Sequence, residues 1–128
     1  MIKLTDDREA ALDAAFLALR ERMPGASRDA LANAMADYRV RAIVTGGEAI
    51  GAFFTKGPEV HVAVVPRHHR RWLTRSLLRE GLQPIIRKYG YATCSVMADN
   101  DRGDRFVRRL GFVPTRDDGR MTHYEVTA

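Results

Sequence analysis

Cysteine is nearly absent from this chain of 128 residues, because Cys94 is the only one. A single cysteine cannot form an intrachain disulfide, which excludes a disulfide-stabilised scaffold and favours a reducing, cytoplasmic location. Cys94 lies among residues typical of a strand, Thr93, Ser95 and Val96. A free cysteine in such a setting is expected to be a small buried hydrophobic residue rather than a nucleophile.

Long apolar runs are also missing. No stretch approaches the roughly 20 residues that a membrane-spanning helix needs, so no membrane partner is expected. The first seven residues, MIKLTDD, lack the apolar core of a secretory leader. The length, with 45% hydrophobic and 29% charged residues, suits one globular domain over residues 1–128.

Acidic residues are outnumbered by basic ones, 16 to 21, which gives a formal net charge of +5. A positive balance favours anionic partners in general. It does not by itself distinguish nucleic acid from a small phosphate-rich ligand.

Residues 59–78, EVHVAVVPRHHRRWLTRSLL, carry the most informative pattern. The β-branched run Val60–Val65 predicts a buried strand, which Pro66 ends because proline lacks a backbone donor. An apolar helical pattern begins at Leu73. The free N–H groups and the dipole at the start of that helix favour an anion. Four arginines surround this turn: Arg67, Arg70, Arg71 and Arg75. The stretch therefore predicts a site for a phosphate-bearing ligand.

This stretch resembles the acetyl-CoA-binding motif of the GNAT N-acetyltransferase superfamily. That motif is a strand ending in a Val-x-Pro-like step, then Gln/Arg-x-x-Gly-x-Gly/Ala, then a helix. Val64-Val65-Pro66 matches the step, and the signature falls on His69-Arg70-Arg71-Trp72-Leu73-Thr74. The sequence departs from the signature at His69, Trp72 and Thr74, where the family has Gln or Arg, Gly, and Gly or Ala. The usual glycines let the backbone approach the pyrophosphate closely.

A second motif supports the resemblance. GNAT chains carry an Asn, about ten residues, and then Leu-Gly-Phe after the cofactor helix. Here Asn100 precedes a helical pattern that closes on Leu110-Gly111-Phe112. The two motifs occur in the family's order, and the resemblance covers roughly Tyr38 to Val126.

The resemblance implies an α/β (α+β) fold: a mixed, mostly antiparallel sheet with a parallel central strand pair and flanking helices. The sequence pattern predicts helices over residues 7–22, from 27, over 73–89 and over 101–110. It predicts strands over 38–45, 48–55, 60–65 and 91–98, and a C-terminal hairpin. Pro84 is expected to kink the third helix and Gly90 to end it. The two N-terminal helices are predicted to be an amphipathic pair that covers a sheet. In GNAT folds the equivalent pair of helices forms part of the wall of the acceptor site.

The resemblance also implies a site for acetyl-CoA as co-substrate. The backbone of the central strand, at Val62, Ala63 and Val64, would bind the pantetheine arm, and Asn100 would bind it from the other side. The pyrophosphate would be held by the loop and helix start, comprising His69, Arg70, Arg71, Trp72, Leu73, Thr74 and Arg75. Trp72 either stacks on a base or packs against the core. The arginines of the 101–110 helix form a solvated face, from which one could reach the cofactor's 3′-phosphate.

Proton transfer is the point at which the sequence departs most from the family. Many GNAT enzymes place a tyrosine acid seven residues after the motif Asn, and that position is Val107 here. Tyr124 is the candidate substitute. Glu59 and His61 share one face of the central strand by its period of two, and either could be the general base. No metal site is expected, because His68 and His69 diverge and have no neighbouring ligands in the sequence.

Two functions stay open on these observations. The first is an N-acetyltransferase that passes an acetyl group to a small-molecule or peptide amine by direct attack. The second is a GNAT-like module that binds CoA or nucleic acid and has lost catalysis. The ordered pair of motifs favours the first, and the missing glycines and Val107 favour the second. The sequence leaves the oligomeric state, including a homodimer, open.

Overall fold

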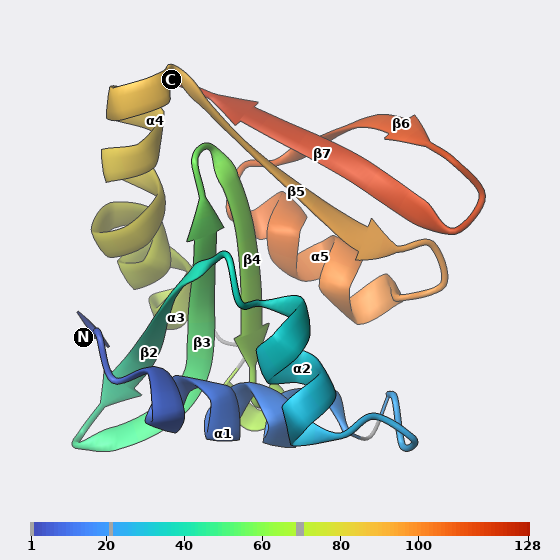
Figure 1. The fold of residues 1–128 in the computed structure, drawn as a ribbon. Helices are drawn as coiled ribbons and strands as arrows, with labels where there is room; N and C mark the ends of the chain where they lie inside the picture. The colour runs from blue at the N-terminus through green and yellow to red at the C-terminus, as the bar shows by residue number, and fades with distance from the viewer. Residues whose placement is uncertain (1, 21, 69–70) are drawn as a thin grey trace.

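The computed structural model describes residues 2–20, 22–68 and 71–128, with Arg71 and Trp72 described by their backbone only. The strands of this part of the chain form one seven-stranded sheet in the order β1-β2-β3-β4-β5-β7-β6 (Figure 1). Their bounds are β1 Lys3–Thr5, β2 Arg39–Thr45, β3 Glu48–Lys56, β4 Glu59–Val64, β5 Tyr91–Met97, β6 Val113–Asp117 and β7 Met121–Thr127. The helices are α1 Arg8–Leu19, α2 Arg28–Ala34, α3 Arg71–Leu77, α4 Gln83–Tyr89 and α5 Asp101–Arg109. A 3₁₀ turn, η1, covers Pro66–His68, and a π-helical segment, η2, covers Leu78–Leu82.

Neighbouring strands pair antiparallel throughout, except for β4 and β5, which are parallel. This confirms the predicted mixed sheet with a parallel central pair. The parallel contact has a single register pair, Glu59 with Thr93. Beyond that pair the two strands diverge, so the sheet has a β1–β4 half and a β5–β7–β6 half that separate toward one end (Figure 1).

Helices cover the two faces unequally. On one face α1 and α2 pack on β2, β3 and β4 through a cluster that includes Leu12, Val40, Phe54 and Ala63. On the other face the α3–η2–α4 segment and α5 cover a larger cluster around Phe53. Because α1 and α2 reach only the β1–β4 half, the same face of β5, β7 and β6 is left open.

Small side chains allow α1 to lie close to the sheet. Asp7 caps this helix, accepting a hydrogen bond of 3.1 Å from the Ala10 N–H. Ala11, Ala14 and Ala15 are buried. The helix ends at Leu19, before the predicted Arg22, because the Leu19 C=O accepts bonds from the N–H groups of both Arg22 and Met23. The resulting turn replaces the last helical turn that the sequence pattern predicted.

The helix after β4 carries a π-helical turn that the sequence pattern did not predict. The Gln83 N–H bonds the Leu78 C=O, a spacing of five residues, immediately before Pro84. Proline cannot donate an intrahelical bond and crowds the residue four before it, and the wider turn relieves that conflict. Gly90 then ends the helix in the left-handed region with φ of 85°. None of the helices in the described ranges is long and apolar enough to cross a membrane.

Gly81 permits the close crossing of the π turn over β3. A Cβ built on Gly81 would come within 2.8 Å of the Phe53 Cζ, and the Phe53 ring is fully buried. We expect Gly81→Ala to destabilise the fold by about 1–3 kcal/mol through overpacking, outweighing the better helix propensity of alanine. Gly25→Ala is the matched control, because a Cβ there meets nothing within 4 Å. Chemical denaturation of both variants measures the difference, and equal free energies of unfolding would contradict this account.

Candidate functional site

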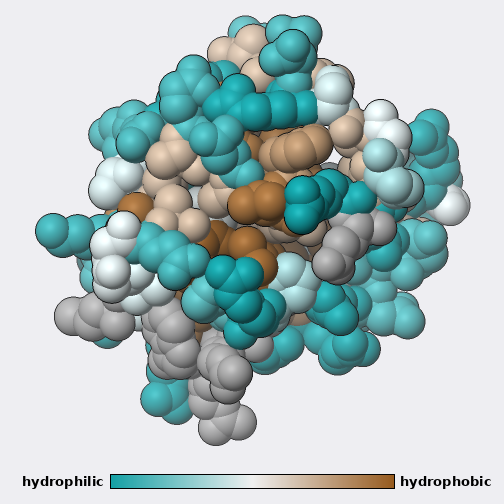
Figure 2. Space-filling model, turned by 90° about the horizontal axis from the view of Figure 1, so that it is seen from below, coloured by the Kyte–Doolittle hydropathy of each residue, from teal (hydrophilic) through white to brown (hydrophobic). Residues whose placement is uncertain are grey.

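A cleft of about 650 Å³ lies where β4 and β5 diverge. Its walls come from β4, β5, the start and inner face of α5, and the ends of α1 and α2. Seen from the end at which the strands separate, apolar side chains form the floor of a hollow ringed by polar residues (Figure 2). The cleft thus passes through the sheet and connects the α1–α2 face with the α5 face.

The backbone of β4 borders the cleft. The Thr93 N–H bonds the Pro58 C=O at 2.9 Å, and the Val65 N–H bonds the Ile50 C=O at 3.0 Å. Since successive residues of a strand turn their backbone groups to opposite neighbours, even-numbered residues of β4 face β5 and odd-numbered residues face β3. Val62 therefore directs its N–H and C=O into the gap left by β5. Ala63, in contrast, directs its backbone toward β3.

Asn100 lies at the opposite wall as the N-cap of α5. Its Oδ1 accepts a 3.0 Å hydrogen bond from the Gly103 N–H. A Cβ on Gly103 would come within 2.5 Å of the Asn100 Nδ2, so the glycine makes room for the cap. The cap uses one of the two acceptor positions of Oδ1, so a ligand could contact this side chain through Nδ2 or through the second position on Oδ1.

The predicted pyrophosphate loop is described only in part. His69 and Arg70 lie outside the described residues, as do the side chains of Arg71 and Trp72. In the described part of the chain the α3 helix starts at Arg71, two residues before Leu73, where the sequence pattern placed its start. Leu73 and Thr74 are buried and pack inward, whereas Arg75 is exposed. Arg67 forms an exposed ion pair with Glu48 at 3.0 Å.

A polar network joins three residues on the α1–α2 face of β2 and β4. The Tyr38 hydroxyl donates to the Glu59 Oε2, and the His61 Nε2 lies 2.6 Å from the same oxygen. The Tyr38 and His61 rings meet edge-on with centroids 5.7 Å apart. The Lys56 Nζ lies 5.6 Å from the centre of the Tyr38 ring. The predicted pair Glu59 and His61 is thus in direct contact, and Tyr38 is a third member that the sequence analysis did not single out.

The network holds Glu59 as a carboxylate. Burial pushes its pKa up, but the hydrogen bonds from Tyr38 and His61 and the nearby positive charge outweigh burial, and the pKa is lowered. The bond to Glu59, with burial, raises the pKa of Tyr38 to about 12, so its hydroxyl stays protonated. His61 lines the cleft and, with Glu59, a smaller pocket beside it. A group bound in the cleft would therefore meet the His61 ring, whose Nε2 is held by Glu59.

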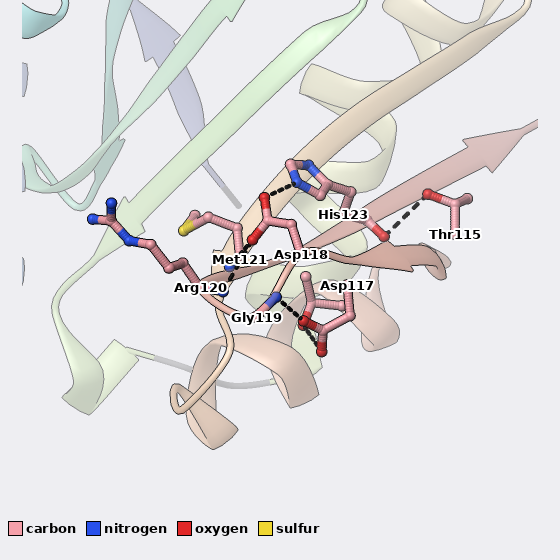
Figure 3. A network of polar contacts seen from close by, with 8 residues as sticks. Thr115, Asp117, Asp118, Gly119, Arg120, Met121 and His123 are labelled. Carbon is pink, nitrogen blue, oxygen red and sulfur yellow. Dashed lines mark hydrogen bonds and ion pairs between the residues drawn. The ribbon is translucent and has the colours of Figure 1, made fainter.

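A second histidine faces the smaller pocket. The His123 Nε2 bonds the Asp118 Oδ2 at 3.1 Å, and Asp118 also accepts N–H bonds from Arg120 and Met121 in the β6–β7 turn (Figure 3). The hydrogen bond from the Met121 N–H lowers the pKa of the Asp118 carboxyl most, and the hydrogen bond from His123 lowers it next. This arrangement fixes His123 on the open sheet face. Among the described residues, no group of three or more metal-binding side chains could hold a metal ion.

Comparisons with known proteins identify the fold. No protein-family model and no curated protein matches the sequence. Among solved structures, the chain is similar to the PaiA N-acetyltransferase of Thermoplasma acidophilum in complex with coenzyme A, with a TM-score of 0.73, 15% identity and coverage of 100% of this chain and 99% of that one. It is also similar to the ribosomal-protein-S18-alanine N-acetyltransferase of Escherichia coli, with a TM-score of 0.66, 18% identity and coverage of 98% and 91%.

A third similar structure is a spermidine N-acetyltransferase SpeG chimera from Vibrio cholerae and hSSAT. Its TM-score is 0.68 at 15% identity, and the match covers 98% of this chain and 94% of that one. All three matches run over nearly the whole of both chains. The chain has the GNAT fold. The divergence of β4 from β5 and the helix that follows β4 are therefore features of a fold shared with N-acetyltransferases, as the two sequence motifs predicted.

Within this GNAT fold, the predicted acid lies on the face opposite Glu59 and His61. Tyr124 is 2% exposed, and its hydroxyl donates to the Asp104 Oδ1 at 2.5 Å. Burial, and to a smaller extent the hydrogen bond to the Asp104 carboxylate, raise the pKa of Tyr124 to about 12. Asp104 precedes Val107 by three residues on α5, so the hydroxyl reaches this helix one turn from the position at which many GNAT enzymes have tyrosine.

Some residues of the site could be found only through strand register. Tyr38 joins Glu59 because β2, β3 and β4 pair in order, and Ser95 and His123 lie opposite each other on β5 and β7. Sequence spacing within one strand gives no such contact. Cys94 borders the cleft but is 8% exposed, and burial raises its pKa to about 12, which agrees with the predicted role of an inert hydrophobic residue.

The Tyr38 bond is expected to make stability depend on pH. The lowered pKa of Glu59 contributes stability above its unfolded pKa, and this contribution is lost as the pH falls through the folded pKa. Tyr38→Phe should therefore cost about 0.5–1 kcal/mol at pH 7, a value reduced because the Glu59 side chain is 40% exposed. The cost should shrink near pH 3.

Denaturant unfolding of the two proteins at both pH values measures this difference. Tyr91→Phe is the control, since it removes an exposed hydroxyl from β5. A cost for Tyr38→Phe that stays constant between pH 7 and pH 3 would show that the hydroxyl does not act through the Glu59 charge.

Proposed function

We propose that the protein is an acetyl-CoA-dependent N-acyltransferase that passes the acetyl group to an amine by direct attack. The observation that carries this proposal is the cleft between the diverging strands β4 and β5, bordered by the Val62 backbone on one side and by the α5 cap on the other. A narrow gap with backbone donors and acceptors suits an extended arm that carries amide groups. The coenzyme A complex named among the similar structures supports the same ligand class.

The residues present fit acetyl-CoA as a co-substrate. In this proposal, Val62 and Val64 of β4 bond the pantetheine amides, Ala63 shapes the strand between them, and Asn100 contacts the arm from α5. The free N–H groups at the start of α3 hold the pyrophosphate. The loop residues proposed to contribute to this part are His69, Arg70, Arg71, Trp72, Leu73, Thr74 and Arg75.

The proposed chemistry needs one base and one acid. The neutral amine nitrogen attacks the acetyl carbon, the C–S bond breaks, and the nitrogen loses a second proton as the amide forms, which balances the proton that the leaving thiolate takes up. Either His61 or Glu59 accepts the one proton that the ammonium must lose before attack, and the lowered pKa of Glu59 makes its carboxylate a weaker base than a free glutamate. Tyr124 supplies the proton to the thiolate, replacing the hydroxyl that Val107 lacks. Its raised pKa keeps the hydroxyl protonated at neutral pH and makes it a weaker acid than a free tyrosine, and the proton released from the nitrogen restores it after donation.

A binding measurement tests the cofactor proposal. Isothermal titration should show acetyl-CoA binding that weakens with salt, because the pyrophosphate contact is partly electrostatic. Arg71→Glu, at the first residue of α3, should weaken binding through repulsion at the helix start. Arg87→Glu changes the charge equally but lies 16 residues along the same helical segment, about 24 Å away. It should leave binding nearly unchanged, since that distance exceeds the Debye length.

Failure to bind millimolar acetyl-CoA would overturn the cofactor proposal. Binding without acetyl transfer would favour the alternative, a GNAT-like module that has lost catalysis. The absence of a hydroxyl at Val107 is the observation that keeps this alternative in view.

The proton donor can be tested by rate. Positioned acids and bases contribute about 10²–10⁴-fold, so Tyr124→Phe and Glu59→Gln should each lower acetyl transfer substantially. Without an acceptor, hydrolysis of the acetyl-CoA thioester is the fallback assay. Asp104→Asn serves as a companion variant, since it removes the charge that holds the Tyr124 hydroxyl. Ordinary turnover in both Tyr124→Phe and Glu59→Gln would show that the protons are handled by other groups.

A further inference from the structure

The methionines of this chain gather in one place. The sequence has five, and the four in the described part, Met23, Met35, Met97 and Met121, all line the cleft. They come from separate elements: the turn after α1, the C-cap of α2, β5 and β7. Four methionines from four elements thus line one cleft, and we call this set of side chains the methionine wall.

The methionine wall belongs to the α1–α2 side of the cleft. Met97 and Met121 lie opposite each other in the β5–β7 register. By the alternation of β5, Met97 shares the face of Ser95, whereas Cys94 and Val96 face the core on the α5 side. Leu19 and Leu31, from α1 and α2, line the cleft beside Met23 and Met35. This side is separate from the α5 wall and the β4 backbone, to which the acetyl-CoA arm is assigned.

The wall is apolar yet accessible. Met23 is 46% exposed and Met97 is 43% exposed. Large apolar side chains left accessible within a cavity are typical of a ligand site, and methionine is the side chain that adapts most readily to varied apolar shapes. In Figure 2, apolar residues, coloured brown, form the bottom of the hollow on this end of the molecule.

The charged groups on this side, among the described residues, are the Arg22–Asp99 ion pair, which lines the cleft, and Glu59. Glu59, on the same face of the sheet, contacts the His61 ring, which lines the cleft. A carboxylate beside an apolar wall complements a ligand with one ammonium group and an apolar body. A polycation would gain the contact with Glu59 but would make no apolar contacts with the methionine wall. It would also be repelled by the net charge of +5 on the protein.

We propose that the acceptor is a primary amine joined to an apolar aromatic or aliphatic body, held by the methionine wall with its nitrogen toward Glu59 and His61. This inference rests on the proposed function, because it names the substrate class of the acetyl transfer. It distinguishes the protein from an enzyme whose acceptor is recognised mainly by charge.

Binding can be followed without turnover. Protein labelled with [methyl-¹³C]methionine gives one methyl resonance per methionine, assigned by single Met→Leu variants. Three probes are titrated, with and without saturating coenzyme A: 2-phenylethylamine, 2-phenylethanol and spermidine. We expect 2-phenylethylamine to shift the wall resonances saturably. The alcohol should bind several-fold more weakly because it lacks the charge that faces Glu59, and spermidine should leave the wall resonances nearly unmoved.

Substitution tests whether the wall provides the affinity. Met97→Gln and Met121→Gln keep the length of the side chain but make it polar, and each should weaken 2-phenylethylamine binding about three- to tenfold. Leu17→Gln is the matched control, because Leu17 is a 49% exposed apolar residue of α1 outside the cleft. Circular dichroism and thermal unfolding confirm that each variant remains folded.

The outcomes separate this inference from the proposed function. Suppose that acetyl-CoA binds but the methionine-wall resonances do not shift with 2-phenylethylamine, or that spermidine binds most tightly. Either result would overturn the proposed acceptor class and leave the proposed acetyl-CoA chemistry intact. Equal affinity in Met97→Gln, Met121→Gln and Leu17→Gln would also overturn it. Loss of acetyl-CoA binding with an intact amine response would instead remove the proposed function and leave an apolar amine-binding cleft.

Discussion

The single register pair between β4 and β5 is the constraint on which the rest of the structure depends. Two parallel strands in contact at Glu59 and Thr93 and separated beyond it cannot satisfy their facing backbone groups with each other. If β4 and β5 were paired along their whole length, no gap would form between them. If they belonged to two separate sheets, no strand pairing would align the two walls of the cleft. The one contact keeps the strands in register, and their divergence leaves a cleft bordered by backbone N–H and C=O groups.

The divergence is tolerated because each half of the sheet is anchored independently. The β4 strand is paired along its length with β3, and β5 is paired along its length with β7. On the α5 face, Phe106, Leu110 and Phe112 join the same buried cluster as Phe53 and Val60, so one core spans both halves. The Arg22–Asp99 ion pair, at 2.6 Å, also joins the α1 end to the start of α5, but its exposure limits what it contributes.

The sequence predicted the fold better than the site. The Val64-Val65-Pro66 step, the helix that follows it, and Asn100 followed by Leu110-Gly111-Phe112 are local patterns, and the structure arranges the described elements that carry them in a GNAT fold. What the sequence could not predict depends on pairs distant in the chain. A glycine is needed at position 81 because the Phe53 ring lies against it. The π turn around Gly81 depends both on Pro84 and on the packing of this segment against Phe53.

The candidate site shows the same limit. Glu59 and His61 were found because a period of two places them on one face, which is a property of a single strand. Tyr38 directly precedes β2, which lies two strands away from β4, and the methionine wall comes from four elements that only the folded chain brings together. Val107 was identified as a departure from the family pattern, but its relation to Tyr124 required the Asp104 contact between α5 and β7.

The two proposed proton-transfer groups lie on opposite faces of the sheet, and this arrangement follows from strand alternation. Glu59 and His61 face α1 and α2, whereas Tyr124 packs toward α5. The gap between β4 and β5 connects these faces, so in the proposed function an acetyl group held in it meets an amine from the α1–α2 side while its sulfur lies toward α5. Direct attack is compatible with this arrangement, because the entering nitrogen and the leaving sulfur lie in different directions about the acetyl carbon. In the same proposal, an acid at Tyr124 on β7, in place of position 107 on α5, remains on the α5 side of the gap. Moving it to the open face, beside His123, would place it among the groups proposed to serve the amine.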